Sequence, residues 1–158
     1  MTHNHHAPAG KLLGIAVRVK PRGEMLEHRS IEVSEESGLS GDFRRKPGRR
    51  QVTVMTVEAW EAACAELEPD ATLPWTTRRA NLLVNGVDLA KQVGAILTVG
   101  DVQLKVTGET DPCGRMDEYH DGLMNALLPD WRGGVCCQVI TGGLISVGDS
   151  VELQRTDG

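Results

Sequence analysis

The feature that most constrains the fold is a pattern that occurs twice near the end of the chain. GAILTVGDVQLKV (94–106) and GGLISVGDSVEL (142–153) each consist of two alternating apolar runs joined by Val-Gly-Asp. Such alternation is typical of a half-buried strand, and Gly-Asp between two strands is a tight-turn signal. We therefore predict a hairpin at each place. Two neighbouring hairpins favour a closed, barrel-like sheet, because closure removes exposed strand edges.

The remaining segments predict more strands and only two helices. Apolar alternation or β-branched content predicts strands over 11–20, 30–34, 50–56, 79–86 and 133–143. Thr56 is a candidate N-cap for a helix over 57–68, which ends before Pro69, and acidic residues open a second helix over 117–128. Cys64 lies on the apolar stripe of the first helix, which indicates a packing role. The expected fold class is mainly β with a few helices (α+β), closed into a barrel.

Composition limits the class of protein. With 158 residues, the chain has the length of one domain, and we expect that domain over 11–155 after a disordered N-terminal lead, 1–10. The net charge of −5 and the presence of only three Trp, one Tyr and one Phe argue against nucleic-acid binding. We find no apolar run long enough to span a membrane and no secretory signal, so we expect a cytoplasmic protein with reduced cysteines.

One cysteine stands in an unusual setting. The four cysteines, at positions 64, 113, 136 and 137, form no C-x-x-C pair, which argues against a structural zinc site. Cys113 follows a proline in the loop TGETDPCGRMDEYHDG (107–122), where it could act as a nucleophile or soft metal ligand. His120 is a candidate proton carrier beside it. The alternatives are that Cys113 is a loop cysteine without a role and that His120 is an ordinary surface histidine, which is the more common case.

Basic residues supply candidate anion contacts. The segment RRKPGRR (44–50) holds five of the 17 basic side chains, and Arg78-Arg79 precedes another predicted strand. Guanidinium groups at strand ends can bind phosphate in bidentate geometry, although most charge runs are solvated faces. The candidate cofactor-binding residues are Arg44, Arg45, Arg49, Arg50, Arg78, Arg79, Asn81 and Arg115.

Several segments together resemble the MOSC domain, named for the C-terminal domain of molybdenum-cofactor sulfurases. They are GLSGDFRR (38–45), RQVTVMTVEAW (50–60), RRANLLVNGVDL (78–89), the stretch 93–123 with its Pro-Cys loop, and RGGVCCQVITGGLISVGDSVEL (132–153). The resemblance implies a barrel-like fold and a molybdenum cofactor (molybdopterin). It also implies that Cys113 ligates molybdenum or carries sulfur, and that basic side chains bind the pterin phosphate. Pyridoxal phosphate is not expected, because no Schiff-base lysine context is present.

The resemblance leaves three functions open. The first is binding of the molybdenum cofactor, or sulfur transfer for it, through Cys113. The second is a reductase of N-hydroxylated compounds that needs a separate electron donor. The third is a non-enzymatic module that binds an anion or a partner protein. Expected partners are the pterin cofactor and a redox or sulfur-donor protein. Many MOSC proteins carry a histidine after the Gly-Asp turn, whereas Phe43 stands after Asp42 here.

Overall fold

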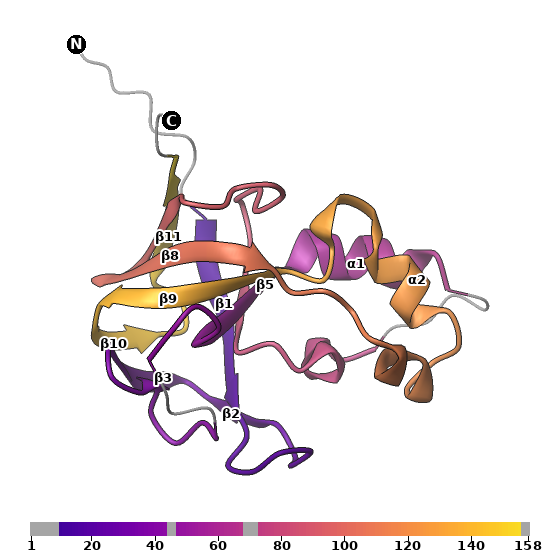
Figure 1. Ribbon diagram of the computed structural model, residues 1–158, viewed down its shortest axis with the longest axis horizontal. Helices are drawn as coiled ribbons and strands as arrows, with labels where there is room; N and C mark the ends of the chain where they lie inside the picture. The colour runs from indigo at the N-terminus through magenta and orange to yellow at the C-terminus, as the bar shows by residue number, and fades with distance from the viewer. Residues whose placement is uncertain (1–9, 44–46, 68–72, 156–158) are drawn as a thin grey trace.

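The computed structural model describes residues 10–43, 47–67 and 73–155, and these residues form a mainly β fold with two α-helices. Figure 1 shows the strands gathered in one lobe and the helices in a second lobe at its side. The strands are β1 Gly10–Val17, β2 Leu26–His28, β3 Ser30–Ser34, β4 Gly38–Leu39, β5 Val52–Thr56, β6 Leu82–Val84, β7 Ile96–Val99, β8 Val102–Glu109, β9 Val135–Thr141, β10 Gly143–Ser146 and β11 Ser150–Gln154.

Seven of these strands close into a barrel. Their order is β11-β7-β8-β9-β5-β6-β1, and β1 pairs with β11 to complete the circle. Gly10 lies opposite Val151 and Lys11 opposite Ser150 at this closing edge. All neighbouring strands are antiparallel except β5 and β6, which pair in parallel with Val54 opposite Leu82. Closure leaves the barrel strands no free edge among themselves, as the sequence pattern predicts.

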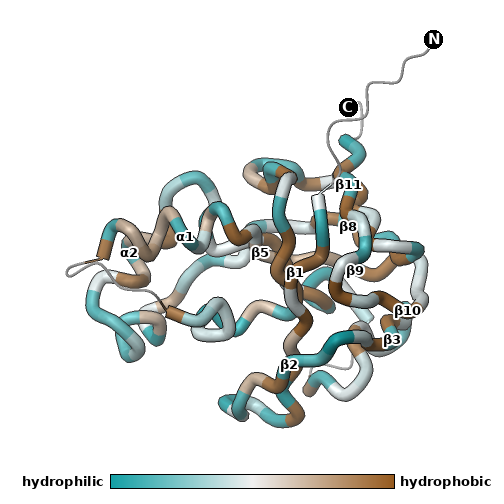
Figure 2. The backbone as a smooth tube through the Cα atoms, turned by 180° about the vertical axis from the view of Figure 1, so that it is seen from behind, coloured by the Kyte–Doolittle hydropathy of each residue, from teal (hydrophilic) through white to brown (hydrophobic). Residues whose placement is uncertain are grey.

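The barrel core is aliphatic. Inward-facing residues from every barrel strand are buried, among them Leu12, Val54, Leu97, Leu104 and Val151, each with no more than 1% of its surface exposed. Figure 2 shows the corresponding hydrophobic stretches along strands such as β1 and β5, with hydrophilic colour on many of the loops. The barrel core is therefore built mainly from Val, Leu and Ile, in agreement with the scarcity of aromatic residues in the sequence.

A second lobe of short helices packs against the barrel. α1 (Val57–Ala65) follows β5 directly, and the hydroxyl of Thr56 caps it by accepting a hydrogen bond from the Ala59 amide at 3.1 Å. α2 (Leu123–Leu127) lies against α1. Three 3-10 turns complete the lobe: η1 Trp75–Arg78, η2 Gly114–Glu118 and η3 Pro129–Trp131. Cys64 belongs to the core of this lobe, which confirms its predicted packing role.

Two sequence-based predictions of local structure are wrong. The first Val-Gly-Asp turn joins β7 and β8 in a hairpin as expected, but the second leads from β10 into β11, and these two strands do not pair. β10 pairs with β3 in a separate three-stranded sheet, while β11 pairs with β7 and β1. Asp149 accepts a hydrogen bond from the Ser146 amide at 2.9 Å, so the same turn chemistry makes a corner between two sheets.

The predicted helix over 117–128 is also broken. Gly122 has φ 89°, a left-handed conformation that ends η2 and its extension before α2 begins. The carboxylate of Asp117 accepts a hydrogen bond from the Met124 amide at 2.9 Å across this break. The predicted strand over 79–86 shortens to Leu82–Val84, because Arg79 is left-handed with φ 68° and closes η1 instead.

Candidate functional site

A cavity of about 240 Å³ lies where the barrel rim meets η2. Cys113, Arg115, Met116 and Tyr119 line it from the helical side. The barrel side contributes the ends of β1 and β5 together with η1. The residues lining this thiol cavity are Arg18, Arg50, Thr53, Arg78, Arg79, Ala80, Thr110, Asp111, Cys113, Arg115, Met116, Tyr119 and Gly133. One cavity thus brings together the loop cysteine and four of the sequence-predicted basic residues.

The Cys113 loop is held in place at both ends. Before the cysteine, the Thr110 amide donates a hydrogen bond to the Gly134 carbonyl at 2.9 Å. After it, the Met116 amide donates to the Cys113 carbonyl at 2.9 Å, which starts η2. Pro112 is buried while Cys113 is exposed. The loop therefore presents the sulfur at the surface of the cavity while its backbone is anchored to the barrel.

Arg78 is the main structural support of this loop. Its side chain is only 7% exposed. Nε donates a hydrogen bond to the Gly133 carbonyl at 3.1 Å, and Nη2 donates to the Thr110 carbonyl at 2.9 Å. Arg78 therefore connects η1, the Cys113 loop and the segment that enters β9. These donors are directed to backbone carbonyls, so Arg78 positions the loop and adds positive charge beneath it.

Gly133 makes this close packing possible. A Cβ atom at this position would lie 2.7 Å from the Thr110 carbonyl oxygen, 3.2 Å from Nη2 of Arg78 and 3.4 Å from Pro112 Cδ. Any side chain would push the Cys113 loop and the Arg78 guanidinium away from the barrel. The glycine in the sequence WRGG thus serves the geometry of the thiol cavity.

The other arginines differ in how they are held. Arg79 lines the cavity and donates a hydrogen bond to the Gly23 carbonyl through Nη2. Its Nε is buried and has no hydrogen-bond partner in the described part of the chain. Arg115 lies half-buried and forms no hydrogen bond or ion pair with the described residues. Arg50 is exposed and lines both this cavity and a neighbouring one.

Arg18 is a residue that sequence reasoning missed. It follows β1 directly, lines the thiol cavity, and its guanidinium carbon lies 4.5 Å from the centroid of the Phe43 ring. In the sequence it stands in RVK, where alternation suggests one more exposed strand position. Val19 is 57% exposed, so the strand has already ended there. Its place in the cavity lining and its contact with Phe43, which is distant in the sequence, distinguish Arg18 from an ordinary surface arginine.

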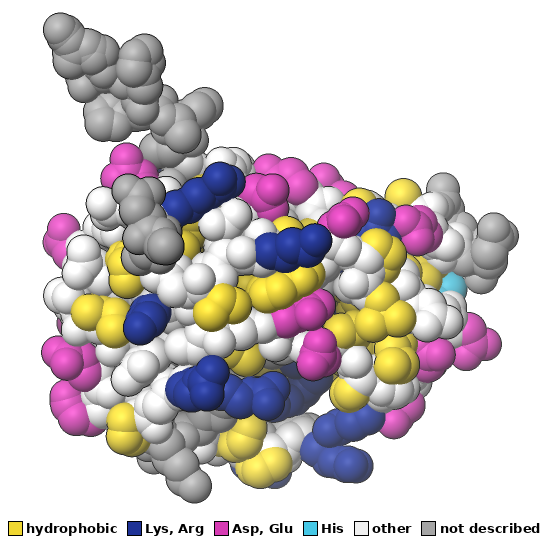
Figure 3. Space-filling model, turned by 45° about the horizontal axis from the view of Figure 1, so that its top comes forward, with side chains coloured by type: hydrophobic (Ala, Val, Ile, Leu, Met, Phe, Trp, Pro, Cys, Tyr) yellow, Lys and Arg dark blue, Asp and Glu magenta, His cyan; other side chains and the backbone are white. Residues whose placement is uncertain are grey.

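The charge of the cavity is opposite to that of the whole protein. Among the described residues, five arginines line it and Asp111 is the only acidic lining residue, although the chain carries a net charge of −5. Figure 3 shows basic side chains gathered low on one face and acidic ones scattered around it. Positive charge concentrated in a hollow attracts anions far more strongly than the same charges spread over a surface. The cavity is therefore suited to an anionic ligand.

A neighbouring cavity of about 270 Å³ extends this region across Arg50. It is lined by Arg49, Arg50, Thr107, Gly108, Glu109 and Cys136. The hydroxyl of Thr110, which lines the thiol cavity, lies 3.2 Å from the Cys136 sulfur. Burial raises the pKa of Glu109, and the neighbouring Asp111 charge and a hydrogen bond to Asp111 raise it further. The two cavities thus share Arg50 as a lining residue.

The adjacent cysteines of β9 have different surroundings. Cys137 points into the barrel core and is fully buried. Burial, with a smaller contribution from Cys136, raises the pKa of the Cys137 thiol far above its ordinary value, so this thiol stays neutral. Cys136 is 3% exposed and lines the neighbouring cavity. The sequence predicts such a division, since successive strand residues face opposite sides of a sheet.

Five predicted site residues are not brought into the thiol cavity, or lie where the structure gives no description. One of them, Arg49, lines the neighbouring cavity instead. Asn81 is buried, and its side chain accepts from the Thr53 amide at 3.0 Å and donates to the Ala16 carbonyl at 3.1 Å. It joins three barrel strands and offers nothing to a ligand. His120 does not line the cavity, and its Nδ1 lies 3.0 Å from the Asp121 carbonyl oxygen. Arg44 and Arg45 lie outside the described residues.

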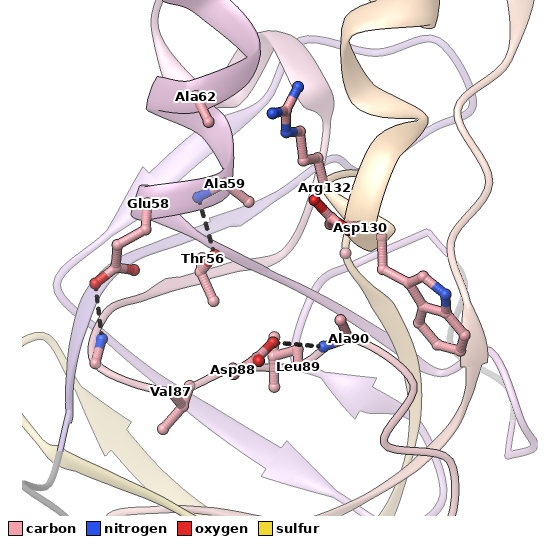
Figure 4. Close-up of a pocket in the computed structure, with 13 residues that line it drawn as sticks. Thr56, Glu58, Ala59, Ala62, Val87, Asp88, Leu89, Ala90, Asp130 and Arg132 are labelled. Atoms are coloured by element: carbon pink, nitrogen blue, oxygen red, sulfur yellow. Dashed lines mark hydrogen bonds between the residues drawn. The ribbon is translucent and has the colours of Figure 1, made fainter.

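A larger cavity, of about 510 Å³, lies on the other side of the segment 132–134. Figure 4 shows it between the start of α1, the loop after β6 and the residues around Asp130. Glu58 accepts a hydrogen bond from the Gly86 amide at 3.0 Å, and Asp88 accepts one from the Ala90 amide at 3.0 Å. Glu58 and Asp88 thus stabilise loops at the wall of this cavity. Although larger, this cavity contains neither a thiol nor a group of arginines.

The described residues contain no group of three or more His, Cys, Asp or Glu side chains arranged to hold a metal ion. Within the same residues, no helix is long and apolar enough to cross a membrane.

A comparison with protein-family models identifies the family of the chain. The model of the MOSC domain matches residues 8–152, and the chain therefore belongs to the MOSC domain family. No curated protein matches the chain at a significant level.

Solved structures of similar fold include the YuaD protein from Bacillus subtilis, with a TM-score of 0.80 and 19% identity over 94% of this chain and 97% of that one. YiiM from Escherichia coli has a TM-score of 0.69 and 18% identity over 94% of this chain and 71% of its own. YiiM from Geobacillus stearothermophilus has a TM-score of 0.65 and 16% identity over 91% of this chain and 74% of its own. At these identities the similarity shows the fold alone.

Proposed function

We propose that the thiol cavity binds the molybdenum cofactor, with Cys113 as the protein ligand to molybdenum and the surrounding arginines as contacts to the anionic end of the pterin. The observation that carries this proposal is the convergence of an exposed thiol and five arginines, from separate parts of the chain, on one cavity. Membership of the MOSC family makes this cofactor the natural candidate.

The chemistry of the lining residues fits such a ligand. A thiolate is a soft donor that suits molybdenum bound by the sulfur atoms of a pterin. Guanidinium groups recognise phosphate through pairs of parallel hydrogen bonds. Arg115 has no partner among the described residues, and the Nε of Arg79 is unmatched. These two arginines therefore retain hydrogen-bonding capacity for a ligand.

The size of the cavity constrains how the ligand is held. About 240 Å³ is below the ~300–1,000 Å³ of pockets that enclose a drug-sized molecule. A ligand carrying both a ring system and a phosphate must extend beyond it. The neighbouring cavity of about 270 Å³ shares Arg50, so it is the expected direction of extension. The ligand would lie partly at the surface, where a partner protein or substrate can reach it.

The residues of this chain have distinct roles in the proposed complex. Cys113 supplies the thiolate, and Arg78 and Gly133 hold its loop at the barrel. Arg50, Arg79 and Arg115 provide positive charge around the anionic end. Tyr119, 45% exposed at the cavity, offers an aromatic face to the planar ring system. When bound, the cofactor supplies oxygen-atom and electron-transfer chemistry at molybdenum.

The test is metal and pterin analysis of protein purified from cells that make the cofactor. We expect the wild type to carry molybdenum and pterin in similar amounts. Cys113→Ser should lose most of the molybdenum, and Arg50→Gln combined with Arg115→Gln should lose both. Cys64→Ala, in the core of the helical lobe, is the matched cysteine control and should behave as the wild type. Equal and negligible molybdenum in the wild type and Cys113→Ser would refute the proposal.

Sulfur transfer for the cofactor is a second use of the same thiol. Cys113 is the exposed cysteine among four, and a persulfide is a reversible state of an accessible thiolate. Mass spectrometry of the purified chain separates the two uses. A gain of one sulfur atom on Cys113, removed by a thiol reductant, supports sulfur transfer, whereas metal without that mass gain supports ligation.

A further inference from the structure

The cavity of about 510 Å³ beside α1 has no part in the proposed function. Its volume lies within the ~300–1,000 Å³ of pockets that enclose small molecules. Most of its walls are apolar, and the apolar lining side chains are Ala59, Ala62, Val87, Leu89, Ala90 and Trp131. Apolar walls with a few placed polar groups are typical of small-molecule sites. The polar groups of this cavity therefore decide which class of molecule fits it.

Three carboxylates stand around the apolar walls, each on a different segment. Figure 4 shows Glu58 on α1, Asp88 on the loop after β6 and Asp130 on η3. Glu58 and Asp88 each accept one backbone hydrogen bond through a single oxygen, so their second oxygens stay available. The Asp130 carboxylate forms no hydrogen bond or ion pair with the described residues. The carboxylates thus keep capacity to bind a hydrogen-bond donor.

The negative charge of this cavity is not balanced from within. Arg132 is its one basic lining residue among those the structure describes. Its Nη1 donates to the Glu66 carboxylate, which does not line the cavity, at 2.6 Å, and to the Ala126 carbonyl at 3.0 Å. Charges gathered around a hollow raise the local concentration of the opposite ion. The occupant that complements this cavity is therefore positively charged.

A buried hydroxyl at the cavity is only partly used by the fold. Thr56 lines the cavity and is 8% exposed. Its oxygen accepts a hydrogen bond from the Ala59 amide at 3.1 Å, but its O–H is donated to none of the described residues. A hydroxyl offers one donor and two lone pairs, and a buried donor left without an acceptor is unfavourable. The Thr56 hydroxyl therefore has a hydrogen bond left for a ligand.

Two consecutive residues of η3 hold an unusual backbone conformation at the same cavity. Asp130 has φ 53° and Trp131 has φ 58°, the left-handed region that non-glycine residues rarely occupy. The Gly134 amide donates to the Trp131 carbonyl at 2.9 Å, which holds the bend. Strained residues of this kind concentrate at ligand-binding segments. The bend places a free carboxylate beside an indole, and an indole face also attracts cations.

We propose that this cavity binds a small organic cation, an amine carried on an apolar body. The carboxylates of Asp88 and Asp130 attract the ammonium group, and the apolar walls with Trp131 take the body of the molecule. The volume fits such a molecule and far exceeds that of a bare metal ion. The site is separate from the thiol cavity, so the proposal does not depend on the proposed function.

The experiment is an NMR titration of the full chain with phenethylamine and, separately, with phenethyl alcohol, its neutral analogue of the same shape. The amides of Gly86 and Ala90 donate to Glu58 and Asp88, so their signals report on the cavity. The amine should bind about tenfold more tightly than the alcohol, the effect of two screened carboxylates. Magnesium ions should not displace the amine.

Three variants separate the contributions of charge and space. Asp130→Asn removes one charge, and asparagine tolerates the left-handed conformation. It should weaken binding of the amine about two- to fivefold and leave the alcohol unchanged. Ala62→Leu, which fills the cavity from α1, should weaken both. Asp101→Asn, at an exposed aspartate outside the cavity, is the control and should change neither.

Four results would overturn the proposal. They are equal binding of amine and alcohol, equal affinity of the wild type and Asp130→Asn for the amine, unchanged binding in Ala62→Leu, and displacement of the amine by magnesium. The first two would show that the carboxylates do not recognise the charge. The third would place the amine outside the cavity, and the fourth would indicate a site for small ions.

Discussion

The two cavities beside the segment 132–134 have opposite chemistry. The thiol cavity carries five arginines, one aspartate and an exposed cysteine. The cavity of Figure 4 is about twice as large, yet it is lined by alanines, three acidic side chains and Arg132, which is paired with Glu66 at 2.6 Å. Size therefore does not indicate the anion-binding site. What distinguishes the smaller cavity is like charge gathered around an exposed thiol, an arrangement that attracts anions.

The adjacent glycines Gly133 and Gly134 line the thiol cavity and the larger cavity, respectively. Of the changes considered, their substitution should lower the free energy of unfolding most. Gly134 has φ 97°, and its Cβ would lie 2.3 Å from the Val54 carbonyl oxygen. Gly134→Ala should cost about 3 kcal/mol of unfolding free energy, from left-handed strain and steric overlap. Gly133→Ala should cost about 2 kcal/mol through its contacts with Thr110 and Arg78.

Urea unfolding of the two variants measures these costs. Gly114→Ala is the control, because a Cβ at that position meets nothing within 4 Å. A Gly133→Ala protein as stable as Gly114→Ala would show that the thiol loop is not packed on the barrel as described.

The second comparison is between Arg78 at the thiol cavity and Arg132 at the larger cavity, whose substitution should lower the free energy of unfolding by different amounts. Arg78→Met leaves the Gly133 and Thr110 carbonyls without their donors in a buried place, which should cost about 3 kcal/mol. Arg132 donates to the Ala126 carbonyl and to the half-exposed Glu66, so Arg132→Met should cost about 1 kcal/mol. Denaturant unfolding checks both values. Equal costs would mean that Arg78 is no more structural than a surface arginine.

Much of the fold could be predicted from local patterns. The hairpin of β7 and β8, the capped start of α1 and the buried strand β9 depend on turn chemistry, capping and alternation close by in the chain. The second Val-Gly-Asp turn was mispredicted because a turn sequence specifies the bend and not the partner strand. β10 finds β3 and β11 finds β7 through distant pairings that no local pattern records.

The candidate site could be predicted only where a residue stands out through its near neighbours in the sequence. Cys113 and the arginine pair 78–79 stand out by their residue type and neighbours. Asn81 stands beside the same arginines in the sequence, yet its side-chain amide forms hydrogen bonds to Thr53 and Ala16 of the neighbouring barrel strands. Arg18 carries no local signal, since only the folded chain brings it to the cavity and into contact with Phe43. Sequence shows which side chains are available, and packing decides which of them remain available to a ligand.

The smallest predicted effect concerns pH. Burial and Asp111 raise the pKa of Glu109 above its ordinary value of 4.5, so the folded state binds this proton more tightly than the unfolded state does. Ionisation of Glu109 therefore opposes folding at pH values above the raised pKa, and this penalty is absent below about pH 4.5. Glu109→Gln should raise the melting temperature slightly at pH 7 and have no such benefit at pH 4. Thermal unfolding at both values measures it, and a benefit that is equal at both would contradict the assignment.

The most direct test that Cys113 and the arginines share one anion-binding cavity compares the alkylation rates of Cys113 by anionic iodoacetate and neutral iodoacetamide. The other three cysteines are buried, so the reaction reports this thiol. If thiol and arginines share one anion-binding cavity, the rate ratio should favour iodoacetate severalfold more in the wild type than in the Arg50→Gln/Arg115→Gln variant. Pyrophosphate should slow the wild-type reaction, and Asp88→Asn in the other cavity should change nothing. An equal ratio in wild type and variant, with no protection by pyrophosphate, would contradict the account.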